Sequence, residues 1–79
     1  MASLTEMAQT AVLTSDIPTR EIAERAGKKY STLMRELNPY DEGAKLGPDT
    51  LLAVMEITGD ITPLEYMAKR LGLTVVKAQ

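Results

Sequence analysis

Eleven consecutive residues of this chain hold four basic side chains and no Asp or Glu. The basic residues are Arg25, Lys28, Lys29 and Arg35, and they give residues 25–35 a charge of +4. Two hydroxyl side chains, Ser31 and Thr32, lie between them. Guanidinium, ammonium and hydroxyl groups donate hydrogen bonds to phosphate oxygens and to the edges of bases. The pattern therefore indicates a surface that binds nucleic acid.

The negative net charge of the chain does not argue against such a surface. The 79 residues include 9 Lys and Arg and 11 Asp and Glu, for a net charge of -2. Outside residues 25–35 there are five basic and eleven acidic side chains, so the rest of the chain carries -6. A Debye length of about 8 Å screens distant carboxylates more than adjacent lysines. The basic stretch can hold a local positive potential.

Several kinds of chemistry are missing from the composition. The chain has no Cys and no His, which excludes disulfides, thiol nucleophiles, Cys/His zinc sites and histidine acid–base catalysis. We therefore expect no catalytic residue, no metal and no cofactor, and we do not expect an enzyme. No apolar run approaches the roughly 20 residues that cross a bilayer, and the N-terminus has no signal-peptide pattern. A cytoplasmic location in a bacterial host cell is expected.

Proline, glycine and helical spacing of apolar residues divide the chain into five predicted helices. They cover residues 4–14, 18–26, 30–37, 48–58 and 63–71, and residues 1–79 are predicted to form one all-α domain. Capping boxes begin at Ser3 and Thr62. The fourth helix is apolar on most sides, which predicts a central position. The fifth is predicted to bury the stripe Leu64, Met67, Ala68 and Leu71.

Residues 18–38 fit a helix-turn-helix, in which two short helices cross at a tight turn. Ala23 is small enough for the helices to approach, and Gly27 readily takes the positive φ that the turn requires. The packing residues of this unit are predicted to be Ile22, Ala23, Ala26, Gly27, Leu33 and Leu37.

The helix from Tyr30 to Leu37 is the predicted recognition helix, and two sets of residues follow from it. The candidates for contacting base edges are Lys29, Ser31, Thr32 and Arg35. The candidates for contacting phosphates are Arg25, Lys28, Tyr30, Asn38 and Lys45. Arg35 can make a bidentate contact to guanine, whereas a lysine ammonium suits a phosphate better. We also expect Tyr40, Asp41 and Lys45 to order the loop before Pro48.

The run from Lys29 to Gly47, together with Gly59-Asp60 and residues 63–68, resembles phage regulatory proteins of the CII type. The resemblance covers roughly residues 17–76. It implies a small, all-α, lambda-repressor-like helix-turn-helix transcription regulator of a bacteriophage or prophage, usually oligomeric. Two residues depart from the general helix-turn-helix pattern: Lys28 and Glu36 occupy positions where apolar residues are common.

The expected partner is therefore a double-stranded DNA operator. A homodimer or higher homo-oligomer is also expected, because one helix contacts only a few base pairs. The apolar tail, residues 73–79, offers Leu73, Val75 and Val76 for a subunit contact, although the tail can equally pack on its own domain. The alternative function is a helical protein-interaction adaptor, antitoxin-like or polymerase-contacting, that keeps the fold without specific DNA binding.

Overall fold

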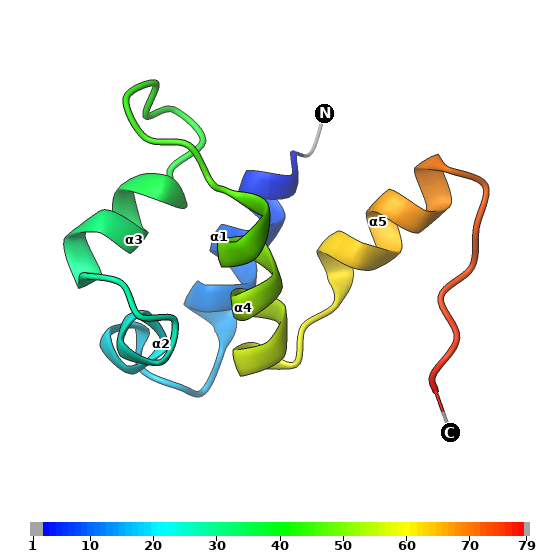
Figure 1. The fold of residues 1–79 in the computed structure, drawn as a ribbon, viewed down its shortest axis with the longest axis horizontal. Helices are drawn as coiled ribbons and strands as arrows, with labels where there is room; N and C mark the ends of the chain where they lie inside the picture. Colours follow the sequence, from blue (N-terminus) through cyan, green and yellow to red (C-terminus); the bar gives the residue numbers. More distant parts are fainter. Residues whose placement is uncertain (1–2, 79) are drawn as a thin grey trace.

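The computed structural model describes residues 3–78, and in this range the chain forms five α-helices and no strand (Figure 1). The helices are α1 (Leu4–Thr14), α2 (Thr19–Arg25), α3 (Tyr30–Glu36), α4 (Pro48–Thr58) and α5 (Thr62–Arg70). The predicted all-α fold class is confirmed. Residues 1, 2 and 79, at the ends of the predicted domain and tail, lie outside the described residues.

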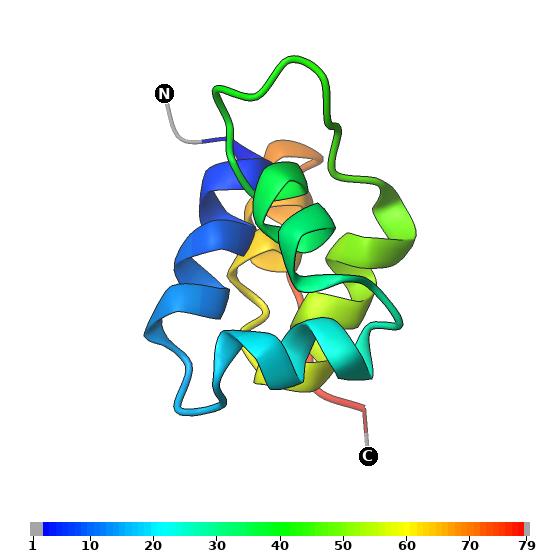
Figure 2. The same ribbon diagram turned by 90° about the vertical axis from the view of Figure 1, so that its left-hand side faces the viewer.

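The core is a single apolar cluster to which α1, α2, α3 and α4 contribute. Figure 2 shows α3 facing the viewer above α2, with α1 on one side and α4 on the other. At the start of α1, Ser3 accepts a hydrogen bond from the backbone N–H of Glu6, as its predicted capping role requires. The buried apolar residues are Ala8, Ala11, Val12, Ile22, Ala23, Leu33, Leu37, Leu51, Val54 and Met55.

A helix-turn-helix is present between Thr19 and Leu37. The N–H of Lys28 donates to the carbonyl of Ala23 at 2.9 Å, and the N–H of Gly27 donates to the carbonyl of Glu24 at 3.0 Å. This is the Schellman arrangement, and Gly27 adopts the φ of +71° that it requires. Because glycine has no Cβ, it takes this conformation without strain. The predicted turn and the burial of Ile22, Leu33 and Leu37 are confirmed.

Helix α4 is less enclosed than its sequence suggests. Leu51, Val54 and Met55 are buried against the core, but Leu52 is 53% exposed. The prediction of a helix surrounded on most sides is wrong, because α4 packs on α1 and α2 with one face and leaves the other to solvent.

Helix α5 differs from its prediction in two ways. Its N-terminus is held by Asp60, whose Oδ1 accepts from the N–H and the hydroxyl of Thr62, and not by a capping box at Thr62. The predicted buried stripe is only partly buried, since Leu64 is 41% and Leu71 is 73% exposed. Figure 1 shows the reason: α5 points away from the bundle and packs mainly on α1. Pro63 is its one fully buried residue.

The tail after α5 lies at the opposite end of the molecule from α3 (Figure 1). It turns at Gly72, whose φ is +74°, and continues without helix or strand through Ala78. Leu73 and Val76 are exposed and Val75 is partly buried, so the tail is not packed on its own domain. Within residues 3–78, no helix has the length and apolar character needed to cross a membrane.

Candidate nucleic-acid interface

Helix α3 has one buried face and one exposed polar face. Leu33 and Leu37 are fully buried, whereas Ser31, Thr32 and Arg35 are exposed. This division follows from the 3.6-residue period, which places residues three or four apart on the same face. The buried leucines fix the rotation of the helix, so its polar face points away from the core.

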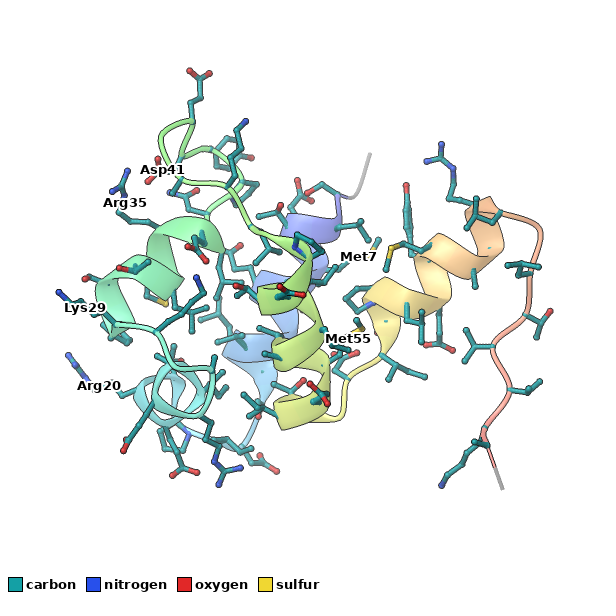
Figure 3. All side chains as sticks on the ribbon, viewed as in Figure 1. Met7, Arg20, Lys29, Arg35, Asp41 and Met55 are labelled. Carbon is teal, nitrogen blue, oxygen red and sulfur yellow. The ribbon has the colours of Figure 1, made fainter. Side chains whose placement is uncertain are left out.

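Three basic residues project from the same side of the molecule. Figure 3 shows Arg20, Lys29 and Arg35 along the edge formed by α2 and α3. Lys29 is the N-cap residue of α3 and is exposed. The Arg20 guanidinium carbon lies 4.2 Å from the centre of the Tyr30 ring, a cation–π contact between the first turns of α2 and α3. The face therefore joins residues from both helices.

Arg20 is a member of this face that was not predicted from the sequence. It lies outside the basic stretch and has acidic neighbours at Asp16, Glu21 and Glu24. The available signal was its position near the N-terminus of α2. A helix-turn-helix brings that end of its first helix beside the start of the recognition helix. The contact with Tyr30 also gives this tyrosine a role within the protein, since its ring supports the guanidinium.

Three of the four cations in residues 25–35 have carboxylate partners. Arg25 pairs with Glu21 one turn earlier on α2. Lys28 pairs with Glu36, and Arg35 pairs with Asp41. Among the described residues, Lys29 has no ion-pair partner. The charge of +4 counted along the chain is therefore largely compensated by carboxylates from outside the stretch.

The pair between Lys28 and Glu36 explains both departures from the helix-turn-helix pattern. The Lys28 Nζ lies 3.0 Å from Oε1 and 3.1 Å from Oε2 of Glu36. Both side chains are substantially buried, with 27% and 15% of their surfaces exposed. Two charged residues thus replace two apolar ones at adjoining positions, and they join the turn to the end of α3. Lys28 is therefore directed into the protein, although sequence analysis assigned it to a phosphate.

The pair between Arg35 and Asp41 links α3 to the loop that follows it. Nε of Arg35 lies 3.0 Å from Oδ2 of Asp41, and Nη2 lies 3.4 Å from Oδ1. The hydrogen bond from Arg35 lowers the pKa of Asp41, and backbone hydrogen bonds from Gly43 and Ala44 act in the same direction. The same pair raises the pKa of Arg35. Both groups are charged at neutral pH.

The remaining candidate residues lie around the loop and the outer face of α2. Asn38 uses Oδ1 to accept the N–H of Tyr40, so its side chain shapes the loop. Tyr40 is 87% exposed and Lys45 is exposed, so neither side chain packs to order the loop as expected. Of the three residues expected to order it, Asp41 is the one that does so. Arg25 is exposed beside Glu21.

A comparison with models of protein families matches nearly the whole chain. A family model described as phage regulatory protein CII (CP76) matches residues 2–79. Neither a curated protein nor a solved structure matches the chain. The family match extends over nearly the whole chain and confirms the resemblance drawn from residues 17–76. This five-helix protein with a helix-turn-helix therefore belongs to the phage regulatory protein CII family.

Proposed function

We propose that this protein is a sequence-specific transcription regulator of a bacteriophage or prophage that acts in the host cytoplasm. It binds double-stranded DNA by placing α3 in the major groove. The observation that carries the proposal is the polar face of α3, which is exposed while Leu33 and Leu37 anchor the opposite face in the core. A helix held in this way can enter a groove without loss of core packing.

The contacts on DNA follow from the positions of the side chains on this face. Base edges are contacted by the exposed residues Lys29, Ser31, Thr32 and Arg35. Phosphates are contacted by residues at the margins: Arg25, Tyr30, Asn38 and Lys45, to which the structure leads us to add Arg20. Lys28 acts chiefly through its ion pair with Glu36, which holds α3 against the turn.

The protein binds its operator as a homodimer or higher homo-oligomer. Support comes from the apolar surface at the end of the molecule opposite α3, where Leu71, Leu73 and Val76 are between 64% and 82% exposed. A partner subunit bound there leaves the α3 face open. Two-fold related subunits would double the number of base pairs contacted, with half-sites about 34 Å apart.

One observation favours the alternative, a protein-interaction adaptor without specific DNA binding. Three of the four cations in residues 25–35 are compensated within the protein, which lowers the positive potential available to phosphates. The two functions differ in their dependence on salt. Displacement of counterions from DNA makes the logarithm of affinity fall by about 0.9 per phosphate contact for each unit of log salt.

The test is to measure binding to a random-sequence 20-base-pair duplex between 50 and 300 mM salt, and to select preferred duplexes from the same library. We expect a steep salt dependence and an enriched sequence. The Arg20→Ala and Lys45→Ala variants, at two residues assigned to phosphates, should each reduce the slope by about 0.9 per contact removed. Lys69→Ala, on α5, is the matched control and should leave the slope unchanged. Salt-independent binding, or no enrichment, would favour the adaptor.

A further inference from the structure

The loop after α3 places a carboxylate and a glycine against the side chain that we assign to base contact. Arg35 belongs to the last turn of α3, and 61% of its side-chain surface is exposed. Two nitrogens on one edge of its guanidinium, Nε and Nη2, approach the two oxygens of Asp41. The contact is therefore side-on, and Nη1 has no hydrogen-bond partner among residues 3–78. Figure 3 shows both side chains on the edge of the molecule formed by α3 and the loop.

The carboxylate of Asp41 is itself held in place. Its Oδ1 accepts the N–H of Gly43 at 2.9 Å, and its own N–H donates to the carbonyl of Asn38 at 3.1 Å. Asn38 in turn accepts the N–H of Tyr40 at 3.0 Å. Only 22% of the Asp41 side chain is exposed. These bonds fix the carboxylate relative to the end of α3, so the guanidinium has a defined partner instead of a mobile surface charge.

Gly43 leaves room for this close approach. A Cβ at position 43 would lie 3.0 Å from Nη2 of Arg35 and 3.4 Å from Oδ1 of Asp41. The first distance is tighter than an ordinary van der Waals contact, so with any other residue the guanidinium would have to shift by a few tenths of an ångström. Gly47, in the same loop, has nothing within 4 Å of a Cβ built there. A side chain at position 43 would therefore contact Arg35, whereas a Cβ at position 47 would contact no neighbour.

We propose that Asp41 and Gly43 are positioning residues that fix one edge of the Arg35 guanidinium and leave the other edge free to contact a guanine. The inference rests on the proposed function, because it gives Arg35 a base as its target. Guanine offers O6 and N7 as a pair of acceptors, which match two parallel N–H groups of arginine. With Nε and one side of Nη2 directed at Asp41, the Nη1 and Nη2 edge remains for this contact. An arginine fixed before binding loses less rotamer freedom on the DNA.

The alternative role for Asp41 is competition, in which the carboxylate withholds Arg35 from DNA. The two roles predict opposite results for Asp41→Asn. Positioning predicts weaker discrimination at one base pair, because the guanidinium is no longer fixed. Competition predicts tighter binding with discrimination at that base pair unchanged or stronger, because a negative charge has been removed and Arg35 is released.

The experiment uses the duplex that the wild-type protein selects from a random 20-base-pair library, and a set of duplexes with one base pair changed in each. Arg35→Ala should lose a preference of roughly 10-fold or more at one G·C pair. Asp41→Asn and Gly43→Ala should each weaken the preference at that same pair by about 3- to 10-fold. Circular dichroism melting confirms that each variant is folded.

Two matched controls separate positioning from charge and from loop flexibility. Glu42→Gln removes an exposed carboxylate beside Asp41 and should alter affinity equally for all duplexes. Gly47→Ala should alter neither affinity nor preference. An unchanged or stronger preference in Asp41→Asn, or a preference lost equally in Glu42→Gln, would overturn the inference while leaving the proposed function intact. If the wild-type protein selects no duplex, both proposals fall.

Discussion

The helix-turn-helix and the α5 region differ in how far their side chains are buried or paired. In the former, Ile22, Leu33 and Leu37 have no exposed surface, and three basic side chains have carboxylate partners. In the latter, Pro63 alone is fully buried among the residues of α5, and Leu71 and Leu73 are mostly exposed. The first region is complete within one chain. The second leaves apolar surface exposed to solvent.

Under the proposed function, the two regions have different requirements. A face that contacts DNA needs fixed side chains, since a contact displaced by even about an ångström loses its hydrogen-bond geometry. A surface that joins subunits needs exposed apolar area instead. In this chain the two requirements are met at opposite ends of the molecule (Figure 1). We expect the two ends to differ in energetics as they do in packing.

The largest expected effect is on stability, from a change in the helix-turn-helix. Leu33→Ala should lower the free energy of unfolding by about 2–5 kcal/mol, because a fully buried side chain is lost and a cavity remains. Leu64→Ala, on α5 and 41% exposed, should lower it by less than about 1 kcal/mol. Urea unfolding followed by circular dichroism measures both. Equal losses would show that α5 belongs to the core as fully as α3 does.

The ion pair of Lys28 and Glu36 should contribute through its partial burial. Lys28→Met should destabilise the fold by about 1–3 kcal/mol, because the Glu36 carboxylate stays partly buried without its partner. The double variant Lys28→Met/Glu36→Leu should recover to within about 1 kcal/mol of wild type, since it restores two apolar residues. Thermal and urea unfolding of the complete double-mutant cycle provide the coupling between the two positions.

The control for this cycle is the exposed pair on the outer face of α2. Arg25 and Glu21 are about half exposed, at 53% and 45% of their side-chain surfaces. Arg25→Met should therefore change stability by less than about 0.5 kcal/mol. A double variant at positions 28 and 36 that is no more stable than Lys28→Met would contradict the compensation that we infer.

The next expected effect is on association of subunits. Leu73→Asp should weaken self-association about tenfold or more, because it places a charge in the apolar surface of the tail. Leu13→Asp is the matched control, since Leu13 is 59% exposed on α1 and Leu73 is 64% exposed. Sedimentation equilibrium over a range of concentrations measures the change. A wild-type protein that is monomeric throughout, or equal effects of the two variants, would remove the tail from the subunit contact.

Much of the fold followed from short-range rules. Ser3 caps α1, Gly27 takes a positive φ, and Pro48 begins α4, because each of these preferences acts within a turn of the chain. The burial of Leu33 and Leu37 followed from helical spacing. Spacing also predicted burial for Leu71, which is wrong, because a periodic apolar face shows what needs covering and not whether the same chain covers it.

The candidate site was less predictable, since its charges are arranged by tertiary structure. Lys28 and Glu36 are eight residues apart, and Arg35 and Asp41 are six apart across the end of a helix. Neither spacing belongs to the set that meets on one helix, so counting charges along the chain overestimated the positive potential. Arg20 was missed for the same reason, because its neighbour Tyr30 comes from the next helix.

The smallest expected effect is on the local stability of α5, and it depends on pH. Hydrogen bonds from the hydroxyl and then the N–H of Thr62 lower the pKa of Asp60. The folded state therefore favours the ionised form, so this stabilisation is present above the usual aspartate pKa of about 3.9 and is lost as the pH falls through the lower folded value. Asp60→Asn keeps an acceptor but has no charge. At pH 6 it should speed amide exchange in α5 about 2- to 3-fold and leave α3 unchanged, because a local change at a cap is worth a few tenths of a kcal/mol.

The same experiment at lower pH supplies the contrast. Below about pH 4 the wild-type carboxyl begins to take up a proton, so exchange in its α5 should approach that of Asp60→Asn. Exchange in α3 should be the same in the wild type and in Asp60→Asn at each pH, because any effect of pH on the ion pair of Arg35 and Asp41 acts equally on both proteins. If α3 and α5 lost protection together in the variant, the two regions would unfold as one cooperative unit. The difference in their packing would then not extend to their local stability.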